Sequence, residues 1–387
     1  MNLGPDLPDR PTAWTNGRVV LPTGVVDGHA VLTSGPRIVA VCRLADVPAD
    51  AQLEDLAGAY LLPGLVDIHT HGALGHSFLD GTDEAFETIL LEQARRGVTG
   101  LLATTSTAPF PDILTALETT RSWMHDGRPG ARVLGAHVEG PYFAAAQAGA
   151  QDPANLRDPD DGSVDALLEH ADVIELVSYA PELPGALELT RRLVALGITA
   201  AAGHSEASDE QMRRCEAAGL SHAIHLWSGQ STTFRRGPYR VPGILEASLS
   251  SDTLTGEIIA DGKHLPVTLL RLARRCFGAE RLCIVSDATS GAGLPDGTPF
   301  TMGAMRYVVR DGVGMMQDGS SFAGSSTLLD GMLRVVTEQA GFPLHEAVRM
   351  ASLTPATVIG LGATKGSLAA GKDADMAVFS LDLRAQR

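Results

Sequence analysis

Apolar residues recur along this chain with two different periods, and the change between them divides the sequence. From Val19 to about Leu56, short β-branched runs alternate with turn residues, which is typical of the strands of a small sheet. From Tyr60 onward, strand-like apolar runs alternate with segments whose apolar residues recur at i, i+3 and i+4, the pattern of amphipathic helices. The strand-like runs are eight in number and cover residues 61–69, 98–105, 132–139, 172–179, 198–203, 221–227, 254–260 and 281–287.

This alternation predicts an α/β fold with a closed (β/α)₈ barrel of the TIM type. Helices are predicted at 84–96, 163–170, 186–196, 266–277 and 344–353, and a hairpin around Tyr307–Val309. Short strands return in the tail, at 366–368 and 375–379. We therefore expect a barrel domain over residues 60–359 and a small β-sandwich domain built jointly from residues 1–59 and 360–387.

Composition narrows the choice of partners. The chain has 387 residues, and 46 acidic against 30 basic side chains give a formal charge of -16, which disfavours nucleic acid and anionic membranes as partners. Its four cysteines show no C-x-x-C spacing, as expected of reduced thiols in a cytoplasmic protein. We expect neither a secretory signal nor a membrane span, because no apolar run has the required length and flanks.

Histidines and carboxylates stand at or just past the ends of the predicted strands, where the active site of a (β/α)₈ barrel lies. His69 and His71 are two residues apart and so face the same side of a strand. Imidazole nitrogens and carboxylate oxygens that converge from several segments are the ligands of divalent metals such as zinc. The pattern predicts a metallohydrolase whose metal ligands are His69, His71, Glu139, His204 and His225.

Two further residues are predicted to be catalytic. Asp287 ends the eighth run, where it can take a proton from an activated water and later protonate a leaving amine. His264 follows the seventh run, in a position to hydrogen-bond a substrate oxygen or a developing oxyanion. His222 is out of phase with His225 on the sixth run and is expected to be structural. For His137, support of the metal ligands and plain packing both remain open.

Together these segments resemble the amidohydrolase superfamily and, within it, the N-acetylglucosamine-6-phosphate deacetylases. The resemblance extends from about Arg18 to Phe379. It is carried by residues 62–72, 135–141, 203–205, 225–226, 259–264, 285–288, 323–327, 349–352 and 371–375. The His-x-His segment is generic to the superfamily, whereas the Glu-Gly-Pro segment at Glu139–Pro141 is specific to this branch. It replaces the carboxylated lysine of related barrels, and here the first lysine in the chain is Lys263.

The resemblance implies a role for each residue of the set. It implies that Glu139, His204 and His225 hold the principal metal and that His69 and His71 complete a second site with Glu139. It implies that Asp287 is the acid and base and that His264 contacts substrate. One or two divalent ions are implied, with zinc favoured and iron or another divalent metal as alternatives. It also implies a homodimer in which an arginine reaches the substrate phosphate bound by the partner.

Two substrate-facing segments depart from the family pattern. The family usually has a Lys-Gly-Ala-His segment whose histidine contacts the sugar, and this chain has Ala148–Gln151. An Asn-Ala-Met segment usually meets the phosphate, and here it is replaced within Trp227–Gln230. The nearby Arg235, Arg236 and Arg240 supply either anion recognition or an ordinary solvated basic patch. The predicted substrate contacts are Gln151, Ser228, Gly229, Arg236, Arg240 and His264.

The resulting hypothesis is a metal-dependent hydrolase that deacetylates an amino-sugar phosphate, converting N-acetylglucosamine 6-phosphate to glucosamine 6-phosphate and acetate. Because the substrate loops are altered, a different N-acyl or cyclic amide substrate is the alternative. A third possibility is a non-catalytic relative that binds a sugar phosphate, although such relatives commonly lose metal ligands and this chain keeps the full set.

Overall fold

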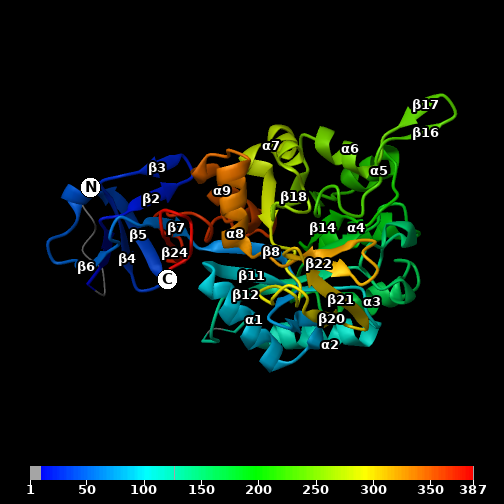
Figure 1. The fold of residues 1–387 in the computed structure, drawn as a ribbon, viewed down its shortest axis with the longest axis horizontal. Helices are drawn as coiled ribbons and strands as arrows, with labels where there is room; N and C mark the ends of the chain where they lie inside the picture. Colours follow the sequence, from blue (N-terminus) through cyan, green and yellow to red (C-terminus); the bar gives the residue numbers. More distant parts are fainter. Residues whose placement is uncertain (1–9, 126, 387) are drawn as a thin grey trace.

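The computed structural model of the chain describes residues 10–125 and 127–386. Its centre is a parallel sheet of eight strands in the order β19-β18-β15-β14-β13-β12-β11-β8 (Figure 1). The strands are β8 (Leu65–Thr70), β11 (Val98–Thr105), β12 (Arg132–Glu139), β13 (Ile174–Tyr179), β14 (Thr199–Ala202), β15 (His222–Ala223), β18 (Thr255–Ile259) and β19 (Leu282–Val285). They correspond one for one to the eight predicted runs.

The sheet closes between its first and last strands. Thr70 and Ala288 form a parallel bridge, the amide of His71 donates to the Ala288 carbonyl at 2.7 Å, and the amide of Asp287 donates to the His69 carbonyl at 2.8 Å. The predicted (β/α)₈ barrel is thereby confirmed. Because these bonds join the segment after β8 to the segment after β19, closure brings two predicted site segments together.

Helices cover the outside of the barrel (Figure 1). They are α1 (Asp83–Arg95), α2 (Phe110–Trp123), α3 (Ser163–Leu168), α4 (Ala186–Ala195), α5 (Asp209–Ala217), α6 (Ile244–Ser250), α7 (Val267–Arg281), α8 (Leu329–Arg334), α9 (Leu344–Met350) and α10 (Leu353–Val358). In α1, the Thr82 hydroxyl caps the first turn, and Phe86, Ile89 and Leu90 bury the face that the periodicity predicted. The helix predicted at 344–353 is α9, which ends at Met350, and a further helix, α10, begins at Leu353 after the non-helical backbone of Ser352.

Between β19 and α8 the chain forms an antiparallel sheet that the sequence pattern only partly revealed. Its strands are β20 (Pro299–Met302), β21 (Met305–Arg310), β22 (Val313–Met316) and β23 (Phe322–Ser325). Only the central hairpin around Tyr307–Val309 was predicted. The outer strands, β20 and β23, have only four residues each, and the small core of Phe300, Tyr307 and Ala323 forms across three strands of the sheet.

The small domain holds two sheets, ordered β5-β4-β1-β6 and β24-β7-β2-β3, at the end of the molecule where the described chain begins and ends (Figure 1). Its strands are β1 (Thr12–Thr15), β2 (Arg18–Leu21), β3 (Gly24–Val26), β4 (His29–Ser34), β5 (Arg37–Arg43), β6 (Gln52–Asp55), β7 (Tyr60–Pro63) and β24 (Met376–Phe379). The antiparallel pairing of β24 with β7 gives the N- and C-terminal segments a shared sheet. Residues 1–9 and 387, which the predicted small domain included, lie outside the described residues.

The passage from this sheet into the barrel falls at Gly64. A Cβ atom there would lie 2.0 Å from Oγ1 of Thr99, so only glycine fits. The run predicted as one strand at 61–69 is two strands, and the first of them, β7, pairs within the small sheet. Within the described part of the chain, no helix has both the length and the hydropathy that a membrane crossing requires.

Phe379 ties the small domain to the barrel, and its removal tests that connection. The ring is fully buried in the cluster that contains Val98, and it lies so close to Gly97 that a Cβ there would approach within 2.6 Å. Because truncation leaves a cavity, we expect Phe379→Ala to lower the free energy of unfolding by about 3–5 kcal/mol in urea denaturation. Leu381→Ala, at a position that is 60% exposed, is the control and should change it by less than about 0.5 kcal/mol.

Candidate active site

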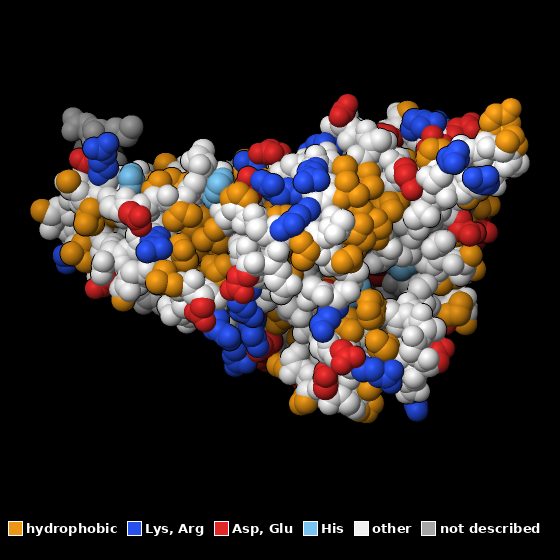
Figure 2. Space-filling view, turned by 45° about the horizontal axis from the view of Figure 1, so that its top comes forward, with side chains coloured by type: hydrophobic (Ala, Val, Ile, Leu, Met, Phe, Trp, Pro, Cys, Tyr) orange, Lys and Arg blue, Asp and Glu red, His pale blue; other side chains and the backbone are white. Residues whose placement is uncertain are grey.

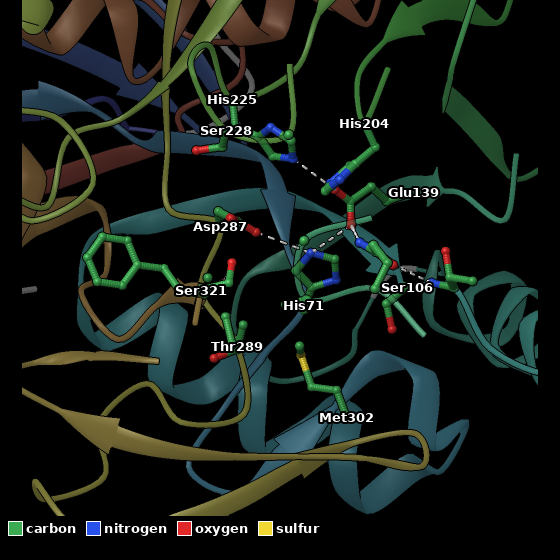
Figure 3. Close-up of a pocket in the computed structure, with 18 of the residues that line it drawn as sticks. His71, Ser106, Glu139, His204, His225, Ser228, Asp287, Thr289, Met302 and Ser321 are labelled. Atoms are coloured by element: carbon green, nitrogen blue, oxygen red, sulfur yellow. Dashed lines mark hydrogen bonds and ion pairs between the residues drawn. The ribbon is translucent and has the colours of Figure 1, made fainter. Parts of the chain in front are cut away.

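A cavity of about 260 Å³ lies at the carboxyl ends of the barrel strands (Figure 3). Of the predicted site residues, those that line it are His71, Glu139, Gln151, His204, His225, Ser228, Gly229, His264 and Asp287. His69 lies just beneath and is fully buried. In Figure 3, His71 and Asp287 point toward Glu139 from one side, while His204 and His225 approach it from the other. The structure therefore brings together every predicted metal ligand and both predicted catalytic residues.

Glu139, the last residue of β12, is the point where the candidate ligands meet. Its Oε1 lies 3.0 Å from Nε2 of His225 and 3.2 Å from Nε2 of His204. Nε2 of His69 lies 3.5 Å from the same oxygen, and Nε2 of His71 lies 3.3 Å from Oε2. A buried carboxylate surrounded by four imidazoles is a donor set suited to a divalent cation.

Asp287 closes the other side of this group. Its Oδ1 lies 3.2 Å from Nε2 of His71 and 3.6 Å from Nε2 of His69. Two sets of three residues each place their ligand atoms within 4.8 Å of one another: His69, His71 and Asp287, and His69, Glu139 and His225. His69 offers one ligand atom and belongs to both sets, so the two sets overlap and mark one region of the cavity where a cation can bind.

Hydrogen bonds on the far side of two rings decide which nitrogen faces the site. Nδ1 of His204 lies 2.8 Å from the Gln147 carbonyl, which can only accept, so Nδ1 carries the proton. Nδ1 of His69 likewise donates to Oε2 of Glu257 at 2.9 Å. In the neutral rings the Nε2 lone pairs then face Glu139, and Nε2 of His69 is buried without a hydrogen-bond partner. Electron-rich atoms that face one another repel, and a cation between them removes the repulsion, so these residues fit a divalent metal.

Three residues of the site have left-handed backbone conformations. The φ angles are 44° at His204, 72° at Trp227 and 43° at Asp287. Such angles cost about 1–3 kcal/mol each for residues other than glycine and persist only where the surrounding structure enforces them. At His204 and Asp287 they accompany side chains that point from strand ends into the cavity (Figure 3). Local strain of this kind is typical of functional sites.

The electrostatics of the cluster keep its carboxylates charged. Burial alone would raise the pKa of Glu139, but its close contacts with the imidazoles of His204, His225 and His69 hold it well below its ordinary value. Burial opposes a lowered pKa at Asp287 as well, and the hydrogen bond from His71 outweighs it. Burial disfavours the charged form of His71, yet its bonds to Asp287 and Glu139 raise its pKa to about 9. The site therefore retains negative charge and demands a cation, whether proton or metal.

The side chains of Gln151 and His264 are both fixed by hydrogen bonds to neighbouring residues. The Gln151 amide donates to Oε2 of Glu139 at 2.5 Å and accepts from the Thr107 amide at 2.7 Å. Gln151 therefore borders the cavity with both ends of its amide engaged. Nδ1 of His264 donates to Oδ2 of Asp261 at 2.7 Å, which leaves Nε2 of His264 for substrate.

The structure does not bring Arg236 and Arg240 into this cavity. They lie on an exposed hairpin, β16 (Phe234–Arg236) and β17 (Tyr239–Val241), which projects from the barrel (Figure 1). In Figure 2, basic and hydrophobic side chains gather at that end of the molecule. Because β16 and β17 pair with each other as an antiparallel hairpin, they extend away from the barrel. Among the described residues that line the cavity, none is lysine or arginine.

Sequence reasoning missed the buried carboxylate that supports the candidate ligands. Glu257 is fully buried on β18 and accepts hydrogen bonds from His69, from His222 and from the amide of His225. The available signal was a single carboxylate inside the apolar run 254–260. A buried charge of that kind requires partners, and their identity could be known only from the fold.

A parallel barrel with histidines and carboxylates collected at its strand ends defines a metal-dependent hydrolase. Sequence comparison agrees: residues 60–386 match the amidohydrolase family, and residues 13–61 match the NagA composite domain. The chain belongs to the amidohydrolase family and is a hydrolase of that family, which confirms the family and the enzyme class predicted from sequence and sets aside the non-catalytic alternative.

Individual relatives point to one branch of the family. The chain is 36% identical over 328 residues to an N-acetylglucosamine-6-phosphate deacetylase of Vibrio furnissii, covering 84% of this chain and 80% of that one. It is 31% identical over 371 residues to an N-acetylgalactosamine-6-phosphate deacetylase of Escherichia coli O157:H7, covering 96% and 95%. The crystal structure of the N-acetylglucosamine-6-phosphate deacetylase from Pasteurella multocida superimposes with a TM-score of 0.89 at 29% identity, over 97% of each chain.

Metal binding should compete with a proton on His71. With a pKa of about 9 in the metal-free protein, the ring is protonated at neutral pH, and a metal binds only the neutral ring. We therefore expect zinc binding at pH 7 to release a proton and the apparent affinity to rise from about pH 6 to about pH 9, as titration calorimetry in buffers of different ionisation enthalpy can measure. His71→Gln should reduce the proton release. An affinity that does not vary with pH over this range would contradict the assignment.

Proposed function

We propose that this protein is a metal-dependent deacetylase of amino-sugar 6-phosphates that converts N-acetylglucosamine 6-phosphate to glucosamine 6-phosphate and acetate. The observation that carries the proposal is the placement of Asp287 beside the candidate metal ligands, 3.2 Å from His71, in a cavity sized for a small molecule. The activities named for the Vibrio furnissii relative and the Pasteurella multocida structure support this choice of substrate.

In this proposal, His204, His225 and Glu139 hold one ion, and His69 and His71 share Glu139 around a second. Zinc is the proposed metal, with iron or another divalent metal as the alternative. When bound, such an ion supplies a water of lowered pKa and polarises the scissile carbonyl. Glu139 is the anionic ligand common to both proposed positions, and its Oε1 faces His225, His204 and His69 while its Oε2 faces His71.

Asp287 is proposed as the acid and base. Because its pKa lies below the ordinary value, it is ionised at neutral pH and can accept a proton from the attacking water. The same oxygen then delivers that proton to the departing amine. His264 lies in the same cavity with Nδ1 held by the ionised Asp261. Its Nε2 accepts from a substrate hydroxyl when the ring is neutral and donates to the oxyanion when the ring is protonated.

The substrate phosphate requires a cationic partner, and the described residues that line the cavity include no lysine or arginine to supply it. Arg236 and Arg240 stand exposed on the projecting hairpin, beside Phe234 and Tyr239, whose side chains are also exposed. We propose a homodimer in which this hairpin reaches the cavity of the other protomer, where Ser228 and Gly229 line the wall. A cytoplasmic location is proposed as well, and the four free cysteines support it.

Acetate release is the direct test of this function. Zinc-loaded protein should favour N-acetylglucosamine 6-phosphate over N-acetylglucosamine by about 10- to 100-fold in kcat/KM, since charge-assisted bonds to a phosphate contribute about 1.5–3 kcal/mol. N-acetylgalactosamine 6-phosphate is assayed beside it. We expect Asp287→Asn to lower kcat by about 10²- to 10⁴-fold while metal remains bound.

Each result has a definite meaning. Near-native turnover by Asp287→Asn would overturn its role as acid and base. Release from none of the sugars by metal-loaded protein would overturn the substrate, and the search would move to other N-acyl compounds and cyclic amides. Equal rates with and without the phosphate would overturn phosphate recognition alone.

Mixing two defective variants tests recognition across the dimer. Arg240→Ala should raise KM about 10- to 100-fold with little change in kcat. When it is co-assembled with Asp287→Asn, each mixed dimer holds one site with an intact Asp287 and an intact Arg240 from the partner, so about a quarter of all sites should turn over substrate with the wild-type KM. Arg213→Ala, on the exposed face of α5, is the matched control and should leave KM unchanged. Failure to complement would show that Arg240 does not act on the partner's site.

A further inference from the structure

We infer that Glu257 prepares His69 to bind metal and thereby makes the second metal position possible. Glu257 touches neither the cavity nor a substrate, so it is a positioning residue that acts through His69. The inference rests on the metal site of the proposed function and adds to it the residue on which that position depends.

The carboxylate of Glu257 accepts three hydrogen bonds from residues around the site. Its Oε2 accepts from Nδ1 of His69 at 2.9 Å and from the amide of His225 at 3.1 Å, and its Oε1 accepts from Nε2 of His222 at 3.0 Å. Nδ1 of His222 is in turn bonded to Oγ1 of Thr255 at 2.7 Å. Since the side chain of Glu257 is fully buried, these three donors fix its orientation.

The effect on His69 follows from competition for one proton. On the cavity side, Nε2 of His69 faces two carboxylates, Glu139 at 3.5 Å and Asp287 at 3.6 Å. Without an acceptor behind the ring, those carboxylates would draw the proton to Nε2 and block the ligand atom. Glu257 holds the proton on Nδ1 instead, so the lone pair of Nε2 is directed at the metal position.

His69 differs from the other candidate ligands in having a carboxylate hydrogen-bonded to its Nδ1. His204 has a neutral carbonyl behind it, and Nδ1 of His71 is buried without a hydrogen-bond partner among the described residues. Only His69, of these three, is backed by a carboxylate, which increases the basicity of a metal-ligating imidazole. Because His69 and His71 complete the second position, its affinity depends on Glu257 more than that of the position at His204 and His225 does.

Two substitutions distinguish the effect of the hydrogen bond to His69 from the effect of the volume that the Glu257 side chain fills. In Glu257→Gln, the amide oxygen can still accept from His69, and the amide nitrogen can donate to His222, so the bond is kept and the charge is lost. In Glu257→Leu, a side chain of similar volume offers no acceptor. Glu92→Gln is the matched control, because Glu92 is a buried carboxylate on α1 that is bonded to Arg96 and lies outside the site.

The experiment measures metal content and affinity rather than turnover. Metal-free protein is titrated with Zn²⁺, the bound metal is counted by plasma mass spectrometry, and the Co²⁺-substituted protein is examined by its visible spectrum. We expect two ions per chain in the wild type and in Glu92→Gln. The affinity for the second ion should fall about 10- to 100-fold in Glu257→Leu and less in Glu257→Gln, in line with other residues that support a metal ligand.

The outcomes distinguish this inference from the proposed function. Wild-type protein that binds no divalent metal would overturn the proposed function itself. Wild-type protein that binds one ion, or variants that bind the second ion as tightly as the wild type does, would overturn the role of Glu257. Should Glu257→Leu fail to fold by circular dichroism, Glu257→Gln decides, since an unchanged affinity for the second ion in that variant also overturns it.

Discussion

A buried negative charge at Glu139 is the constraint on which the rest of the site depends. An ionised carboxylate removed from water is strongly unfavourable unless cationic or donor groups surround it. Here its nearest neighbours are imidazole nitrogens, and in the neutral rings the hydrogen bonds behind His69 and His204 leave lone pairs rather than protons facing it. The arrangement is therefore complete only with a cation at its centre. A proton on His71, whose pKa is raised by Asp287 and Glu139, can take part of that role.

Barrel closure supplies the geometry that this charge requires. The strand ends carry Glu139 from the third strand and the histidines from the first, fifth and sixth, and the seam between β8 and β19 adds Asp287. Because the amide of Asp287 is bonded to the His69 carbonyl, the proposed acid and base is attached to the same backbone that holds a candidate ligand. The strained backbone at Asp287 and His204 is maintained by this closed framework.

Much of this could be predicted from sequence because the relevant signals are local. Strand length, helical period and the position of a histidine at a strand end are each read within about ten residues, and the eight strands and the cluster around Glu139 were found from them. Glu257 was not, since its partner His69 is 188 positions away and nothing in a short apolar run indicates which group it meets. The contacts of Gln151 were not foreseen either. Its position suggested a substrate contact, whereas the fold places its amide against Glu139 and Thr107.

The groups proposed for catalysis and the groups proposed for substrate recognition lie in different parts of this molecule. Substitutions are tolerated less well in the first set than in the second. The groups around Glu139 are buried and mutually bonded, so replacing one leaves a charge or a lone pair uncompensated. The cavity walls come instead from loops, from the sheet β20–β23 through Met302, Met305 and Phe322, and in our proposal from the hairpin of a second protomer. Substitutions there alter contacts without exposing a buried charge. The departures at Ala148–Gln151 and Trp227–Gln230 fall in such segments, so the chain can share its hydrolytic centre with relatives named for different amino-sugar phosphates while differing from them in what it selects.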